Sequence, residues 1–279
     1  ARDQGTTNYR FDFDRDGADE WVLENAGLRL IVSPESGGRA IALVDKVTGL
    51  NLSTSVGLLR DNFSFTENPA GIKPERAGGR NGLFNRPYSA EWVSQEKNPA
   101  LKMKYDAPDI IPAGASIEKS VQFESADTLR IDYRVALHAS RENENTPERM
   151  HTQSFVAVNS FPAKAEPGQV TRVCWAAGSF NDPGDSANKN SAESKEKAVC
   201  SEFVPGGKTI EVPEGMRRVE VQTPGRAGMA IEWECGKICA RMTIEPKKFS
   251  ALFRLEFPPL IPGGEAENYT VRLRVIGAP

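Results

Sequence analysis

Apolar and polar residues alternate one by one along much of the chain. In residues 129–137 every second residue is apolar, from Leu129 to Leu137, and most of the residues between them are charged. The same alternation recurs over residues 121–124, 218–221 and 269–275. A period of two residues is typical of β-strands that bury one face and expose the other. The pattern therefore predicts half-buried antiparallel strands.

Shorter apolar segments predict further strands. They cover residues 20–24, 28–33, 39–45, 88–95, 100–105, 152–158, 170–176, 228–234, 239–244 and 250–257. Glycine and proline separate these segments at short intervals, and no segment keeps an apolar period of about 3.6 residues over four turns. About fifteen short strands without a clear helix predict an all-β fold, a large antiparallel β-sandwich.

Two stretches lack this alternation. Residues 64–86 are rich in Gly, Asn, Arg and Pro, and residues 178–198 are almost free of apolar side chains. Loops of about 20 residues in a compact domain are usually functional or disordered. The first stretch mixes arginine, asparagine and phenylalanine and is interpreted as lining a site, which makes Arg80 and Arg86 candidate binding residues. The second stretch is interpreted as a surface excursion. No internal repeat or linker interrupts the chain, so we expect residues 1–279 to form a single domain.

Composition excludes two classes of partner. Hydrophobic residues make up 39% and charged residues 26% of the chain, which is normal for a globular protein with a sizeable core. The formal net charge is −3, and Lys and Arg form no basic stripe, which argues against nucleic acid. No apolar run approaches the roughly 20 residues that cross a bilayer. We therefore expect neither nucleic-acid binding nor membrane insertion.

Four cysteines are present, at positions 174, 200, 235 and 239. A zinc site favours C-x2-C spacing or a nearby histidine, whereas the close pair here is C-x3-C and both histidines lie far away. The spacing favours two disulfides, Cys174–Cys200 around a polar loop and Cys235–Cys239 across a tight hairpin; free buried thiols are the alternative. Disulfides indicate an oxidising compartment, so we expect a secreted or periplasmic protein.

An aspartate-rich loop occupies residues 12–20. Its potential metal ligands are Asp12, Asp14 and Asp16 at loop positions 1, 3 and 5, the Ala18 carbonyl at position 7 and Glu20 at position 9. Clustered carboxylates favour a hard cation, and oxygen ligands in this spacing are typical of calcium. An EF-hand would have a glutamate at position 12, where Leu23 stands, and flanking helices. The loop predicts a structural calcium site between strands; a solvated acidic turn is the alternative.

In residues 20–61 a strand ending in Glu24-Asn25 is followed by a second strand, Pro34, Gly37-Gly38-Arg39, and a third strand that leads to Asn51-Leu52 and Arg60. This arrangement resembles the start of galactose-mutarotase-like domains. The segment is most similar to the non-catalytic β-sandwich domains appended to bacterial glucan-processing glycoside hydrolases. This resemblance implies a large antiparallel β-supersandwich.

Three short segments are similar to parts of aldose 1-epimerases of that fold, which use a histidine acid and a glutamate base. GGRNGLFNRPY at 78–88 lacks the family's histidine. HTQSFVAVN at 151–159 would make His151 the acid, and LEFPPLIPGGEAENY at 255–269 would make Glu256 the base. The alternatives are an ordinary strand histidine and an ordinary outward-facing strand glutamate.

These observations favour a non-catalytic domain of an extracellular protein that binds carbohydrate or packs beside a catalytic domain that does. Arg60, Arg80, Arg86 and Trp92 are the candidate sugar contacts, although a strand tryptophan more often serves packing. One rival is an aldose 1-epimerase, in which His151 and Glu256 would face each other across one concave sheet. The other rival is a purely structural module, which would present a flat face without an arginine-lined cleft.

Overall fold

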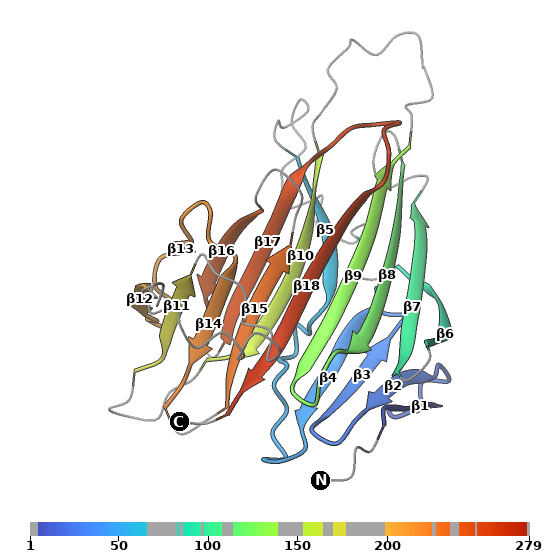
Figure 1. Ribbon diagram of the computed structural model, residues 1–279, viewed down its shortest axis with the longest axis horizontal. Helices are drawn as coiled ribbons and strands as arrows, with labels where there is room; N and C mark the ends of the chain where they lie inside the picture. Colours follow the sequence, from blue (N-terminus) through green and yellow to red (C-terminus); the bar gives the residue numbers. More distant parts are fainter. Residues whose placement is uncertain are drawn as a thin grey trace, which may run out of the picture.

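Eighteen β-strands in three antiparallel sheets form the described part of the protein in a computed structural model (Figure 1). The structure describes residues 5–65, 83, 86–95, 98–107, 114–138, 153–163, 170–176, 199–224, 227–234, 240–248 and 250–277. Within these residues there is no α-helix. The expectation of an all-β fold built from large antiparallel sheets is confirmed.

Each sheet combines strands that lie far apart in sequence. The nine-stranded sheet has the order β12 (Val199–Glu202), β11 (Arg172–Ala176), β14 (Arg218–Gln222), β15 (Gly228–Glu234), β18 (Glu267–Ile276), β9 (Thr128–Leu137), β8 (Ala115–Phe123), β7 (Asn98–Ala107) and β6 (Ser89–Gln95). The five-stranded sheet has the order β13 (Ile210–Glu211), β16 (Arg241–Pro246), β17 (Ser250–Leu260), β10 (Gln153–Pro162) and β5 (Arg60–Phe65). The four-stranded sheet contains β1 (Thr7–Phe11), β2 (Glu20–Glu24), β3 (Leu28–Ser33) and β4 (Arg39–Asp45) in chain order.

The nine-stranded and five-stranded sheets stack face to face. Phe155 of β10 lies with its ring centroid 5.1 Å from that of Tyr133 in β9, and Phe257 of β17 lies 4.1 Å from Tyr269 in β18. Burial alternates strictly along β8 and along most of β17, so the apolar residues of each strand enter this core while their neighbours point outward. The period-two pattern of the sequence thus produces the sandwich directly.

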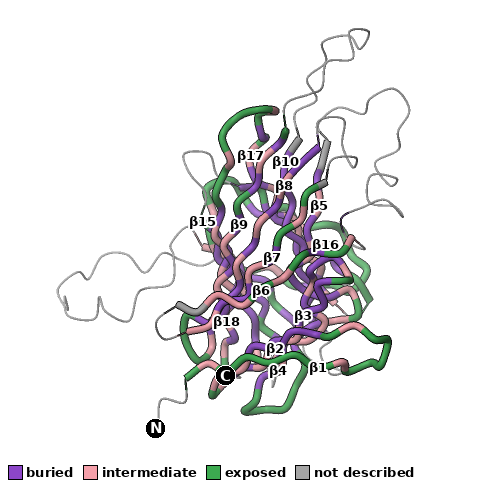
Figure 2. The backbone as a smooth tube through the Cα atoms, turned by 90° about the vertical axis from the view of Figure 1, so that its right-hand side faces the viewer, coloured by how far each residue is buried: buried purple, intermediate pink, exposed green. Residues whose placement is uncertain are grey.

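The four-stranded sheet packs beside β6 and β7 at one end of the nine-stranded sheet (Figure 1). Trp21 of β2 and Trp92 of β6 form the contact, with ring centroids 4.9 Å apart. The guanidinium of Arg10, the cross-strand partner of Trp21 on β1, lies 3.7 Å from the centroid of the Trp21 ring. The outermost strand, β1, is exposed along its whole length (Figure 2). Trp92 therefore has a packing partner, as the alternative interpretation of strand tryptophans allows.

An ion pair lies in the core between the two large sheets. Lys119 of β8 donates to Asp61 Oδ2 of β5 at 2.7 Å and to the Leu59 carbonyl at 2.8 Å, and both charged side chains are fully buried. The Tyr88 hydroxyl donates to the same carboxylate oxygen at 2.8 Å. Burial raises the pKa of Asp61, while the charge of Lys119 opposes that shift. These hydrogen bonds join the two sheets through polar groups that water does not reach.

The predicted strand boundaries agree closely with the structure where the alternation is regular. β2, β3, β4 and β15 begin and end at the expected residues. Four strands were not predicted, namely β1, β5, β12 and β13. In β5 the inward position 61 carries aspartate instead of an apolar residue, and β1 has no buried face. Neither segment therefore shows the pattern that marks a half-buried strand.

Cys174 and Cys200 form the predicted disulfide. They lie opposite each other on the antiparallel strands β11 and β12, with their Cα atoms 4.0 Å apart. Cys235 and Cys239 lie outside the described residues, so that pairing stays a prediction. A search of the described residues for a helix of sufficient length and hydropathy to cross a membrane finds none.

Candidate functional site

The outer face of the five-stranded sheet carries a band of polar side chains. Strand register aligns Asn62 of β5, Glu256 of β17 and Arg241 of β16, with the buried Val156 of β10 between Asn62 and Glu256. The core side chains Leu255 and Phe257 flank Glu256 in sequence, so Glu256 itself points away from the core. Directly opposed residues of antiparallel strands share a face, which brings Glu256 and Arg241 together.

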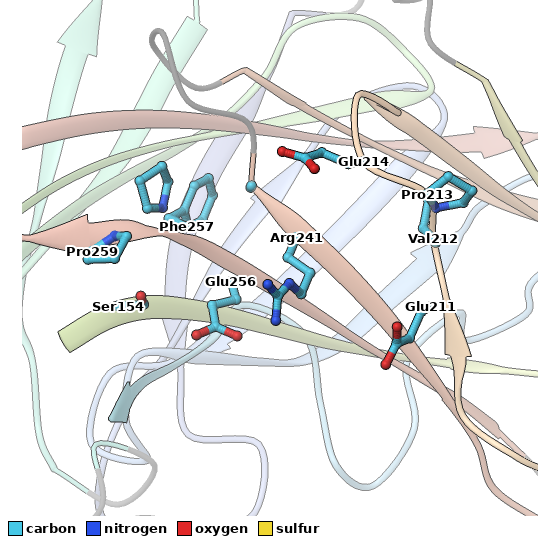
Figure 3. A pocket seen from close by; sticks show the side chains of 11 residues that line it. Ser154, Glu211, Val212, Pro213, Glu214, Arg241, Glu256, Phe257 and Pro259 are labelled. Carbon is cyan, nitrogen blue, oxygen red and sulfur yellow. The ribbon is translucent and has the colours of Figure 1, made fainter. Parts of the chain in front are cut away.

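A pocket of about 660 Å³ opens on this face (Figure 3). Its lining residues come from β10, β13, β16 and β17 and from the turns beside them: Ser154, Glu211, Val212, Pro213, Glu214, Ala240, Arg241, Glu256, Phe257, Pro258 and Pro259. Figure 3 shows the side chains of Glu256 and Arg241 side by side, with Glu211 farther along the same wall. The pocket therefore combines carboxylates and a guanidinium with an apolar wall of proline.

Arg60 lies on the same face of the sheet, two residues along β5 from Asn62. It pairs in register with Val158, which in turn pairs with Arg254 of β17. The side chain is partly buried, and burial lowers the pKa of Arg60; the positive charge of Arg39 lowers that pKa further. Sequence similarity had indicated Arg60 and Glu256 separately, and the register places both on one sheet face.

Of the other candidate residues, the described ones, Arg86 and Trp92, do not line this pocket. His151 and Arg80 lie outside the described residues, so the proposed pairing of His151 with Glu256 stays a prediction. Arg86 is partly buried and precedes β6, and Trp92 packs against Trp21. Arg241 and Glu211 were not predicted as site residues. Glu211 lies on β13, which pairs with β16 although β14 and β15 separate the two strands in sequence, so only the register reveals it. Arg241 lies opposite Glu256 on the consecutive strands β16 and β17.

The aspartate-rich loop brings three of its predicted ligands together. One carboxylate oxygen each from Asp12, Asp14 and Glu20 lies within 4.8 Å of the others. Asp16 is not in this group, and its carboxylate instead accepts a hydrogen bond from the Ala18 N–H at 2.8 Å. The loop joins β1 to β2, as expected for a connection between strands.

The geometry of this group fits a cation. Asp12 Oδ1 is buried and has no hydrogen-bond partner among the described residues. Glu20 is only 3% exposed. Burial raises the pKa of its carboxyl group, and the negative charges of Asp14 and Asp16 raise that pKa further. The hydrogen bond that the carboxylate accepts from the Phe13 N–H lowers the pKa and only partly offsets this shift. A cation would offset the electrostatic repulsion between these close carboxylates and would be coordinated by Asp12 Oδ1. Asp12, Asp14 and Glu20 can therefore hold a metal ion.

Comparison with solved structures identifies the fold. The chain aligns over 99% of its length with galactose 1-epimerase from Lactobacillus acidophilus NCFM, covering 100% of that protein, at 11% identity and a TM-score of 0.55. The fold is of the galactose-mutarotase type. The Slr1438 protein from Synechocystis sp. PCC 6803 aligns with 96% of the chain, over 99% of its own length, at 13% identity and a TM-score of 0.62.

A larger enzyme contains a similar domain. The 4-alpha-glucanotransferase from Thermococcus litoralis aligns with 97% of the chain at 16% identity and a TM-score of 0.59, but the chain spans only 41% of that enzyme. No protein-family model and no curated protein sequence matches the chain. At these identities the structural likeness establishes the mutarotase-type fold alone.

Proposed function

We propose that the protein is a non-catalytic carbohydrate-binding domain and that its sugar site is the pocket beside Glu256. The observation that supports this proposal most is the pocket itself, because about 660 Å³ lies within the range that small-molecule sites occupy. Its carboxylates accept hydrogen bonds from sugar hydroxyls, and the Arg241 guanidinium donates to them. A purely structural module would have no need of this concave polar surface.

The lining residues favour binding over turnover. Opening a sugar ring requires an acid and a base within hydrogen-bond reach of it. Glu256 is a possible base, but no histidine is among the described residues that line the pocket. The side chain opposite Glu256 is the Arg241 guanidinium, and a guanidinium does not serve as a general acid. We therefore expect a sugar to be held by these side chains and released unchanged.

Arg241→Ala should weaken binding of maltotriose or galactose about tenfold or more, because a charge-assisted hydrogen bond to the sugar is lost. Glu256→Gln should weaken binding by a similar factor. Isothermal titration calorimetry measures both. Glu245→Gln is the matched control, since Glu245 lies on the same β16 strand but does not line the pocket. Unchanged affinity in both pocket variants would contradict the assignment of the site.

Polarimetry distinguishes binding from the epimerase alternative. Mutarotation of glucose and galactose should proceed at the uncatalysed rate in the presence of the protein. An acceleration that disappears in His151→Ala or Glu256→Gln would instead identify an aldose 1-epimerase. The same comparison tests whether His151 contributes an acid to the site.

We also propose that this domain accompanies a carbohydrate-active enzyme in an extracellular or periplasmic protein. The similar domain within the larger glucanotransferase supports the first part of this proposal. The Cys174–Cys200 disulfide supports an oxidising compartment. Limited proteolysis of the full-length gene product, followed by mass mapping of the fragments, would show whether a second folded domain is attached.

For the aspartate-rich loop we propose a structural calcium ion held by Asp12, Asp14 and Glu20. Calcium at about one hundred times its Kd should raise the free energy of unfolding by about 2.7 kcal/mol. The measurement is thermal unfolding with calcium and with a chelator. Asp12→Asn should abolish the difference, whereas Asp19→Asn, an exposed carboxylate of the same loop, should retain it. Equal melting temperatures of the native protein in both buffers would refute the proposal.

A further inference from the structure

A β-bulge shapes the wall of the pocket beside Glu256. Between Ser154 and Val156, β10 advances by two residues, while their partners on β17 lie three residues apart. The extra residue disrupts the ladder locally and bends the strand that carries it, as bulges near functional sites commonly do. Pro258 and Pro259 lie in this stretch of β17, and a proline donates no hydrogen bond to a neighbouring strand. The bulge therefore places two proline rings at the wall of the pocket.

Ser154 brings a buried hydroxyl group to this pocket. Phe155 enters the core, so the neighbouring Ser154 points to the outer face of the sheet, where it lines the pocket (Figure 3). Ser154 is only 2% exposed, and its hydroxyl has no hydrogen-bond partner among the described residues. A buried hydroxyl without a partner costs free energy, which a polar ligand would offset. Ser154 thus points to a ligand that carries a hydrogen-bonding group.

Negative charge predominates among the described residues that line the pocket. The charged ones are Arg241 and three glutamates, Glu211, Glu214 and Glu256, so one guanidinium and three carboxylates leave a net charge of −2. Arg241 lies opposite Glu256 in strand register, which allows it to offset the charge of that residue. Glu211 and Glu214 are exposed, and within the described ranges neither side chain forms an ion pair or a hydrogen bond. These two carboxylates therefore remain for a ligand of opposite charge.

Strand pairing places the carboxylates within reach of one ligand. Glu211 of β13 pairs with Thr243 of β16, two residues from Arg241, so Glu211 and Arg241 point to the same face of the five-stranded sheet. From a strand spacing of about 4.8 Å and a rise of about 3.4 Å per residue, the Cα atoms of Glu211 and Arg241 lie about 8 Å apart. Glu214 follows β13 in the chain and lines the same pocket. A sugar that contacts Arg241 can thus reach Glu211 with one of its substituents.

We infer that the sugar bound here is an amino sugar, whose ammonium group is held by Glu211 or Glu214 while a ring hydroxyl forms a hydrogen bond with Ser154. This inference rests on the proposed function and specifies its ligand class. Binding removes water from the carboxylates, and an ammonium group compensates with charge-assisted hydrogen bonds, which are about twice as strong as neutral ones. A neutral sugar offers only hydroxyl groups, and an anionic sugar would meet charge of its own sign.

Four sugars that differ in one substituent test this inference: glucose, glucosamine, N-acetylglucosamine and 6-amino-6-deoxyglucose. At pH 6 the two amines are protonated, whereas the acetylated nitrogen carries no charge. In titration calorimetry at low salt, at least one ammonium sugar should bind about tenfold or more tightly than glucose, and N-acetylglucosamine should not share this gain. Raising NaCl should reduce the gain, because salt screens the attraction between the ammonium and the carboxylates. The sugar that gains identifies the ring position, C2 or C6, that meets the carboxylates.

Variants of the two glutamates connect the preference to the pocket. The double variant Glu211→Gln/Glu214→Gln should abolish the preference for the ammonium sugar, because glutamine keeps a hydrogen-bonding group and loses the charge. Ser154→Ala should instead weaken all four sugars by a similar factor and retain the preference. Glu202→Gln, which changes an exposed glutamate of β12 in the nine-stranded sheet, is the matched control and should also retain it. Thermal unfolding of each variant verifies its fold, and the two single variants provide a second test if the double variant does not fold.

The outcomes separate this inference from the proposed function. Equal binding of glucose and both ammonium sugars, or a preference that persists in the double variant, would overturn the amino-sugar class and leave carbohydrate binding intact. Unchanged affinities in Ser154→Ala would overturn the contact assigned to that hydroxyl. Failure of every sugar to bind the native protein, maltotriose included, would overturn the proposed function as well.

Discussion

Lys119→Met should lower the free energy of unfolding by about 3–5 kcal/mol, because it leaves the Asp61 carboxylate buried without its counter-charge. Neither charged side chain is exposed, and the Lys119 ammonium donates both to Asp61 and to the Leu59 carbonyl. The variant therefore loses two hydrogen bonds and an ion pair in a region without water. Urea denaturation monitored by circular dichroism measures the change.

The double variant Lys119→Met/Asp61→Leu should recover much of that loss. Replacement of a buried ion pair by apolar residues of similar volume is often neutral, whereas removal of one partner is not. The Tyr88 hydroxyl then loses its acceptor, so we expect recovery to be incomplete. Lys104→Met is the control, since Lys104 and Asp106 form an exposed pair at 3.8 Å that contributes at most about 1 kcal/mol. A loss below about 1 kcal/mol in Lys119→Met would show that the buried pair does not stabilise the sandwich.

Removal of the Cys174–Cys200 disulfide should lower the free energy of unfolding by about 3.5 kcal/mol. The bridge joins residues 26 positions apart, and closing a loop of that length restricts the unfolded chain by about this amount. The Cys174→Ala/Cys200→Ala variant, compared with the native protein by urea denaturation, gives the value. We expect local opening of the structure to increase most at β12, because this edge strand pairs only with β11 among the described strands.

A reducing agent provides an independent measurement of the same bridge. Dithiothreitol should lower the melting temperature of the native protein and leave that of the Cys174→Ala/Cys200→Ala variant unchanged. If reduction affects both proteins equally, the effect arises elsewhere, and the Cys235–Cys239 pair is then the next candidate. A native protein whose stability is the same in both conditions would contradict the stabilising role of Cys174–Cys200.

The fold class and many strand positions were predictable because they depend on local pattern. Alternation of apolar and polar residues states which face of each strand enters the core, and this sufficed to place β2, β3, β4 and β15. The Cys174–Cys200 pairing was predictable from spacing around a polar segment. The order of aspartates in residues 12–20 similarly indicated which carboxylates could cluster, although Asp16 lies outside the group that the structure forms.

Strand order in the sheets was not available from the sequence, and it decided the candidate site. Arg60 and Glu256 share one face because β10 pairs with both β5 and β17, whereas Arg241 and Glu256 lie on the consecutive strands β16 and β17. Lys119 and Asp61 lie on different sheets, and the sequence around each residue does not predict their ion pair, which forms only when the sheets stack. Sequence by itself determined the half-buried strands, since their periodicity is local. Only the tertiary structure decided which charged side chains meet, because strand pairing and sheet stacking join segments far apart in the chain.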